Sequence, residues 1–289
     1  MPCDVAAHEN LPACALWTDC AKPAPAAKSH HDPKGRRAAT FPRVAAAGRI
    51  GTSSRRAAAD MSHVPTRYHG LWRRTLYAEP AEGEPGFVDR DTQVFWLQAG
   101  DWHADLRVPA DRPDFTGVAT LADCDRDQLA WIARQTAFAG LTRVEGRFCT
   151  WHRLVDLAPT LDKDIGEMRF VDENTLEECH PRGLYRELWQ RVTLAHTAAP
   201  RAHFDETGLP RWLQYGDHAM AITPRVALDS AHELLAGAET LSKTSLHARA
   251  AVEVSLAYRT PAGWHVRLST WPWREGQSTR DPSRASPGV

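Results

Sequence analysis

The sequence predicts an all-β protein with one or two short helices. Short segments that alternate apolar and polar residues recur along the chain, with Gly, Pro, Asp and Asn between them. Helical spacing with a capping residue is clear only over residues 125–139, which Gly140 follows. About ten strands in about 210 residues favour an antiparallel up-and-down β-barrel, because closure removes exposed strand edges.

The composition of the chain changes near Met61. Residues 1–62 are rich in Ala, Pro and Arg and have no strand or helix periodicity, so we expect a disordered leader. A transit peptide, or a natural start at Met61, are alternatives for this segment. Residues 276–289 have the composition of a disordered tail. The predicted barrel domain is therefore 63–275.

The strands are predicted from the order of apolar runs and turn residues. Residues 71–77 form the first strand, and residues 92–109 form a hairpin around Ala99-Gly100-Asp101. After the helix, which Asp125 caps with Gln128, more strands follow. They are predicted at 142–148, 150–157, 166–171, 175–179 and 185–192, then one or two within 211–225, and finally at 248–258 and 263–271. A short amphipathic helix is expected at 230–241.

The second strand of the early hairpin has two different faces. Side chains on alternate positions point to opposite faces of a strand. The apolar positions are Trp102, Ala104, Leu106 and Val108, and the polar positions between them are His103, Asp105 and Arg107. These polar residues line a ligand site if they point into the barrel, and they are a solvated surface if they point outward.

A weak repeat suggests a second architecture. The hairpins at 94–108 and 251–268 both have a second strand that begins with Trp-His and carries Arg, as Trp102-His103 and Trp264-His265. The alternative to one barrel is therefore two related small barrels.

Composition excludes several classes of partner. The net charge of −1 argues against nucleic acid, and no run of eighteen apolar residues is present to span a membrane. Cys124, Cys149 and Cys179 lack a Cys-x-x-Cys spacing, which favours buried reduced thiols in a cytoplasmic protein. No phosphate-binding or nucleophile motif occurs, and His103-x-Asp105 is the one close ligand pair that stands out after the leader, so we predict no cofactor and no metal.

Gly70-Leu71-Trp72 resembles the opening of a lipocalin (calycin) barrel. A wider set of short segments between about Gly70 and Trp273 resembles uncharacterised bacterial proteins with lipocalin-like barrels. These segments are Trp96-Leu97-Gln98, Ala104-Asp105-Leu106-Arg107, Phe138-Ala139-Gly140, Cys149-Thr150-Trp151-His152, Asp164-Ile165-Gly166 and Tyr185-Arg186-Glu187-Leu188-Trp189. The resemblance implies that Trp72 packs beneath an Arg from near the end of the barrel, with Arg267 or Arg274 as candidates. It implies no catalytic residue.

The leading functional hypothesis is a barrel that binds a small apolar or amphipathic carboxylate in its cavity. An inward Arg can hold a carboxylate bidentately while aromatic side chains cover the apolar part of the ligand. The expected contacts are Arg107, Trp96, Trp102, Arg267 and Tyr185. The sequence leaves open which ligand binds and the oligomeric state.

Two alternatives use the same barrel. The first is an enzyme, which we regard as less favoured than a binder. It would use His152 with Asp156 or Glu187 for acid–base chemistry, within a polar group that also includes Asp164, Glu178 and Tyr185. The second is a structural or protein-interaction barrel with a filled interior and an exposed apolar patch.

Overall fold

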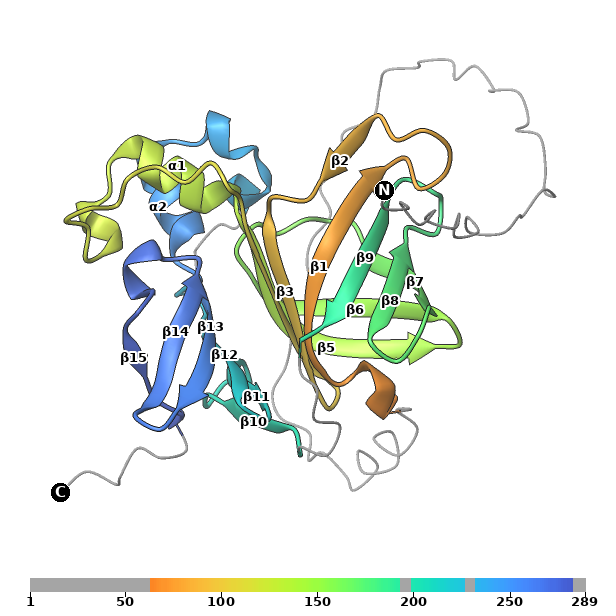
Figure 1. Cartoon of the computed structure of the whole chain (residues 1–289). Coiled ribbons are helices and arrows are strands. Elements are labelled where there is room, and N and C mark those ends of the chain that lie inside the picture. The colour runs from red at the N-terminus through yellow and green to blue at the C-terminus, as the bar shows by residue number, and fades with distance from the viewer. Residues whose placement is uncertain (1–62, 193–198, 227–231, 283–289) are drawn as a thin grey trace, which may run out of the picture. The chain divides into compact units, whose positions relative to one another are not determined.

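The computed structural model describes residues 63–192, 199–226 and 232–282. They are mostly β-structure with two short α-helices, α1 (Arg126–Arg134) and α2 (Lys243–Ala250), so the all-β prediction is confirmed (Figure 1). The predicted leader, residues 1–62, lies outside the described residues.

Eight antiparallel strands close into a barrel. They are β1 (Gly70–Glu79), β3 (Gln93–Ala99), β4 (Trp102–Val108), β5 (Thr136–Glu145), β6 (Phe148–Asp156), β7 (Asp164–Phe170), β8 (Thr175–Cys179) and β9 (Arg186–Arg191). Each pairs with the next, β9 pairs back with β1, and the short β2 (Phe87–Asp89) adds to β1. The barrel prediction is confirmed, with eight strands in place of about ten. The later strands belong elsewhere.

Those later strands form a second sheet of six. In sheet order they are β10 (Arg201–Phe204), β11 (Pro210–Tyr215), β12 (His218–Thr223), β13 (Glu253–Thr260), β14 (Gly263–Ser269) and β15 (Ser278–Thr279). No backbone pairing of the described residues joins β10 to β15, but His203 and Asp281 approach to 3.6 Å across that gap. β15 lies in the predicted disordered tail, which is wrong for residues 276–282 because Ser278 and Thr279 pair with β14.

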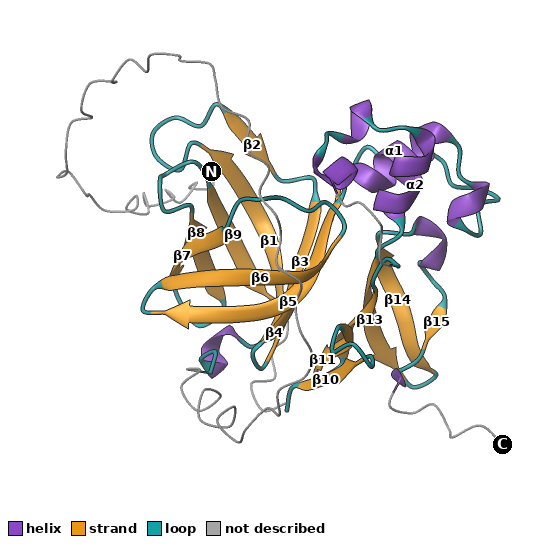
Figure 2. Cartoon of the chain, turned by 180° about the vertical axis from the view of Figure 1, so that it is seen from behind, coloured by secondary structure: helices purple, strands orange, loops and turns teal. Residues whose placement is uncertain are grey.

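The helices lie in the two long connections that precede β5 and β13, and α1 packs against α2 (Figure 2). The capping box of α1 is as predicted, because the backbone N–H of Gln128 donates to Asp125 Oδ1 at 2.8 Å and the backbone N–H of Asp125 donates to Gln128 Oε1 at 2.9 Å. The helix ends at Arg134 and not at 139, since Thr136 already pairs with Arg107 in the sheet. The helix predicted at 230–241 is wrong for the described residues 232–241, which form two 3₁₀ turns, and the α-helix begins at Lys243.

The second sheet repeats the first part of the barrel. The segment Trp-Leu-Gln-x-Gly-Asp occurs at 96–101 in β3–β4 and at 212–217 in β11–β12. In the first copy Trp96 Nε1 donates to Gln98 Oε1 at 3.2 Å, and Gln98 Nε2 donates to the Gly100 carbonyl at 2.9 Å. The second copy repeats both bonds at 3.4 and 3.0 Å, with the glycine again at positive φ. The two hairpins are therefore structural equivalents.

This equivalence corrects the repeat predicted from Trp102-His103 and Trp264-His265. Strand order makes β5–β6 the counterpart of β13–β14, so Trp264-His265 matches Trp151-His152. Trp151 meets Trp96 edge to face with ring planes at 83°, and Trp264 meets Trp212 at the same angle. The predicted relation between the two halves of the chain exists, but it was assigned to the wrong strands.

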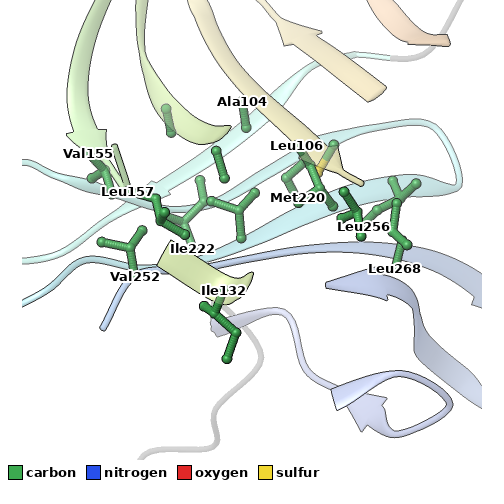
Figure 3. Packing of buried hydrophobic residues seen from close by; sticks show 14 of the residues in the cluster. Ala104, Leu106, Ile132, Val155, Leu157, Met220, Ile222, Val252, Leu256 and Leu268 are labelled. Carbon is green, nitrogen blue, oxygen red and sulfur yellow. The ribbon is translucent and has the colours of Figure 1, made fainter. Parts of the chain in front are cut away.

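The largest apolar core lies between the outer face of the barrel wall and the second sheet. Side chains from both sheets and from α1 face one another there, as Figure 3 shows. The barrel contributes Ala104, Leu106 and Val155, the second sheet contributes Met220 and Leu256, and α1 contributes Ile132. Because this face of β4 is occupied by core packing, its alternate residues must point into the barrel.

Candidate functional site

The polar face of β4 points into the barrel. His103 and Asp105 are 0% and 3% exposed, while the alternate residues Ala104 and Leu106 belong to the outer core. His103 Nδ1 lies 3.0 Å from Thr142 Oγ1, which in turn donates to Gln98 Oε1. These polar residues therefore form a cluster inside the barrel and not a solvated surface.

Arg107 is held by two buried carboxylates. Its Nε donates to Asp105 Oδ1 at 2.8 Å, and its Nη1 donates to Glu187 Oε1 at 3.2 Å. Arg74 Nη1 donates to the same oxygen of Glu187 at 2.7 Å and Arg74 Nη2 to Asp89 at 2.6 Å. Two guanidiniums thus bridge three carboxylates across the barrel. Arg107 already has the partners that a ligand carboxylate would have to replace.

Glu178 is a third buried carboxyl of this region and lies directly opposite Glu187 in the sheet. Burial, and then the charge of Glu187, raise the pKa of Glu178 well above its usual value, which favours the neutral acid. Its oxygens accept from Tyr185 Oη at 3.1 Å and Trp189 Nε1 at 3.2 Å. Gly166 makes room for it, since a Cβ there would lie 2.7 Å from Glu178 Cγ.

Arg153 forms the other half of the interior network. It donates to Asp164 Oδ2 at 2.6 Å and to Asp156 Oδ2 at 3.3 Å, and its guanidinium lies 3.7 Å from the centre of the Phe138 ring. The register of β5 and β6 shifts between Ala139 and Gly140, which is a β-bulge. This bulge turns Asp156 to the face of Arg153.

The bulge separates the predicted catalytic residues. Simple alternation places His152 and Asp156 on one face, but His152 is exposed on the outside while Asp156 and Glu187 point inward. The proposed pairing of His152 with Asp156 or Glu187 is therefore wrong. The inward histidine is His103, whose pKa burial and then Arg153 lower to about 3.

The barrel interior is filled. Trp72, Trp96, Trp151 and Trp189 pack together in it. The remaining space near Trp96 and Arg107 is about 10 Å³, which is room for about one water molecule. The space inside the barrel at Trp96 and Arg107 is therefore too small for the expected ligand.

One end of the barrel is closed by Arg191. Its guanidinium lies 4.0 Å from the centre of the Trp72 ring and donates to the carbonyls of Arg67, His69 and Glu173. This is the position predicted for Arg267 or Arg274, and both assignments are wrong. Arg267 lies over Phe95 on the outer side of the barrel, and Arg274 bonds to Glu253 of the second sheet.

The other predicted ligand contacts are dispersed. Trp96 is buried in the interior, and Trp102 packs on the outside against Phe204, with ring centroids 4.5 Å apart. Tyr185 and the side chain of Arg153 reach a larger cavity at the opposite, open end of the barrel. The structure therefore does not bring Arg107, Arg267 and Trp102 to one site.

This open-end cavity, which we call the mouth cavity, has a volume of about 600 Å³. It lies between the β6–β7 and β8–β9 connections, and its lining includes Arg153, Lys163, Asp164, Arg182, Leu184 and Tyr185. Lys163 and Arg182 are exposed, and no salt bridge among the described residues includes either. Sequence reasoning missed Lys163, Arg182 and Leu184 because loop residues have no periodicity. The available signal was Leu184, an apolar residue in a short polar loop.

In the described ranges, no group of three or more His, Cys, Asp or Glu side chains is arranged to hold a metal ion. No helix in the same ranges is long and apolar enough to cross a membrane. Comparison of the chain with protein-family models, with curated proteins and with solved structures gives no match. The fold and the site thus define a class, an antiparallel β-barrel whose filled interior combines packed tryptophans with buried charges and whose open end holds a cavity.

Proposed function

We propose that this protein is a lipocalin-like barrel that binds a small amphipathic carboxylate in the mouth cavity. The observation that carries the proposal is a cavity of about 600 Å³ with two unpaired cations at its edge. Cavities of roughly 300–1,000 Å³ hold small organic ligands. The pairing of Trp72 with Arg191 at the closed end supports the lipocalin resemblance.

The charges of the mouth cavity suggest how such a ligand is oriented. Arg153 is already bonded to Asp164 and Asp156, so the deep part of the cavity offers no uncompensated cation. Lys163 and Arg182 are the cations without a carboxylate partner among the described salt bridges. We therefore place the ligand carboxylate beside these two residues and its apolar part against Ile165 and Leu184.

The positions of the histidines favour a binding protein over an enzyme. His103 is bonded to Thr142, and its lowered pKa keeps it neutral. His152 is on the outer face, away from Asp156. Cys124 and Cys149 are buried thiols, which supports placing the protein in the reducing cytoplasm.

Titration calorimetry with decanoate, benzoate and the neutral analogue decanol tests the proposal. We expect at least one of the two acids to bind and the neutral analogue to bind more weakly. The double variant Lys163→Glu/Arg182→Glu should weaken the binding of that acid at least tenfold. The matched control is Arg143→Glu/Arg147→Glu, which reverses two exposed cations of the β5–β6 hairpin at the opposite end. Absence of binding by every acid, or equal loss in the control, contradicts the proposal.

A protein-interaction barrel is the second candidate, and the filled interior favours it. Leu161 and Leu184 beside the mouth are 86% and 53% exposed, which gives the open end an apolar surface. In that case none of the acids binds, and Leu161→Ser/Leu184→Ser weakens association with a protein partner.

A further inference from the structure

We propose a second ligand site, in the second sheet, that binds a small organic phosphate. A cavity of about 510 Å³ lies between β10, the β13–β14 turn and β15, and we call it the arginine cleft. Its charged lining residues are Arg201, Arg259, Arg280 and Asp281. This site is separate from the mouth cavity and shares no residue with it.

The arginine cleft has an excess of positive charge. Three guanidiniums line it against the single carboxylate of Asp281, which also lies 3.6 Å from His203. No salt bridge among the described residues includes Arg201, Arg259 or Arg280. Like charges brought together at one cavity repel, and a bound anion would relieve that repulsion.

The internal repeat shows how the described residues at this end of the second sheet differ from those at the closed end of the barrel. The strand pairings place the start of β10 where β1 starts in the barrel, with His203 opposite Trp212 as Trp72 is opposite Trp96. In the barrel that end is covered by the 3₁₀ turn Thr66–Tyr68 and by Arg191 over Trp72. Among the described residues of the second sheet, arginines line the corresponding end in place of such a cover.

The groups in the arginine cleft match a phosphate monoester. Arginine holds phosphate oxygens bidentately, and serine and threonine hydroxyls are further donors. Ser278 and Thr279 line the cleft beside Arg280. Three cations and one carboxylate leave an excess of two positive charges, which a phosphate dianion neutralises and a monocarboxylate does not.

The volume of the cleft indicates that the ligand is larger than inorganic phosphate. Trp264 and Ala262 supply an apolar wall next to the cations, and the Arg259 guanidinium lies 5.9 Å from the Trp264 ring centre. An organic group attached to the phosphate would contact this wall. The predicted ligand class is therefore an aromatic or similarly apolar phosphate monoester.

Titration of the full chain with phenyl phosphate, inorganic phosphate and benzoate tests this site. We expect phenyl phosphate to bind at least tenfold more tightly than either of the other two, because each of them lacks one half of the recognised group. The double variant Arg201→Gln/Arg259→Gln should weaken the binding of phenyl phosphate at least tenfold. The control is Arg267→Gln, which replaces an exposed arginine of the same sheet outside the cleft. It should not change the affinity for phenyl phosphate.

The two proposed sites are distinguished by crossing the variants. Lys163→Glu/Arg182→Glu should leave phenyl phosphate binding unchanged, and the arginine-cleft variant should leave acid binding at the mouth unchanged. Circular dichroism and melting temperature confirm that each variant is folded. The proposal is overturned if phenyl phosphate does not bind the wild-type chain, or if Arg267→Gln weakens it as much as Arg201→Gln/Arg259→Gln.

Discussion

The guanidinium of Arg191 lies 4.0 Å from the centre of the Trp72 ring and joins the last barrel strand to the first. The same group donates to the carbonyls of Arg67 and His69, both at 2.6 Å, so it also fixes the turn that precedes β1. One side chain therefore links the first and last strands of the barrel and also covers this end of the barrel.

Replacing Arg191 should destabilise the barrel. Arg191→Ala removes charged hydrogen bonds to three partly buried carbonyl groups, so we expect a loss of about 3 kcal/mol in the free energy of unfolding. Chemical denaturation measures this loss. Arg267→Ala is the control, and as an exposed residue it should change stability by less than about 0.5 kcal/mol. Equal effects of the two substitutions would contradict the role of Arg191.

Removing Arg107 should be costly because its partners stay buried. Arg107→Ala removes the guanidinium that pairs with Asp105 and takes one of two guanidiniums from Glu187. Breaking a buried pair in this way costs about 3–5 kcal/mol. Urea denaturation of this variant is compared with that of Arg143→Ala, whose exposed ion pair with Glu145 should contribute at most about 1 kcal/mol. A small loss for Arg107→Ala would mean that water replaces the guanidinium.

Gly166 and Glu178 should be energetically coupled. Gly166→Ala places a Cβ 2.7 Å from Glu178 Cγ, and such overpacking costs about 1–3 kcal/mol. Shortening the carboxyl side chain with Glu178→Asp should recover part of that loss in the double variant. A double-mutant cycle on unfolding free energies measures the coupling. Additive losses would show that the two side chains adjust independently.

His103 should make the protein less stable in mild acid. Its pKa is about 3 in the folded protein and near 6.5 when unfolded, so between these values the unfolded chain binds the extra proton. Stability contributed by this group therefore falls as pH falls, by about 2 kcal/mol between pH 7 and pH 5. His103→Asn keeps an amide beside Thr142 and should lose less stability over the same range. Identical pH dependence in both proteins would contradict a neutral buried His103.

Alternation in β4 was enough to place His103, Asp105 and Arg107 on one face, because strand geometry has a period of two. It did not indicate which way that face points, and the structure supplies the direction because Ala104 and Leu106 pack in the core outside the barrel. Alternation failed in β6, because the bulge at Gly140 changes the face of Asp156 and leaves no mark in a hydrophobic pattern. A Cβ on Gly140 would lie 1.9 Å from the His152 carbonyl oxygen, so only the three-dimensional contact explains that glycine.

Long-range contacts were the other limit of the sequence. Arg191 and Trp72 are far apart in the chain, and several other arginines were equally plausible partners for Trp72. The repeat at 96–101 and 212–217 was present in the sequence, but the shorter Trp-His pattern led to a different pairing of hairpins. Lys163 and Arg182 lie in connections, where neither strand nor helix periodicity indicates which cavity a side chain reaches.

The two copies of the repeated hairpin pack against each other within one chain much as the two subunits of a homodimer do. Equivalent elements contact each other, since β3 packs on β11 and α1 on α2, as equivalent surfaces do across a two-fold interface. The second copy thereby covers the apolar outer wall of the first, including Leu97 and Leu106. A fragment limited to residues 63–192 would expose that wall and should self-associate. Sequence drift between the two copies can then give each a different ligand while the shared interface is kept.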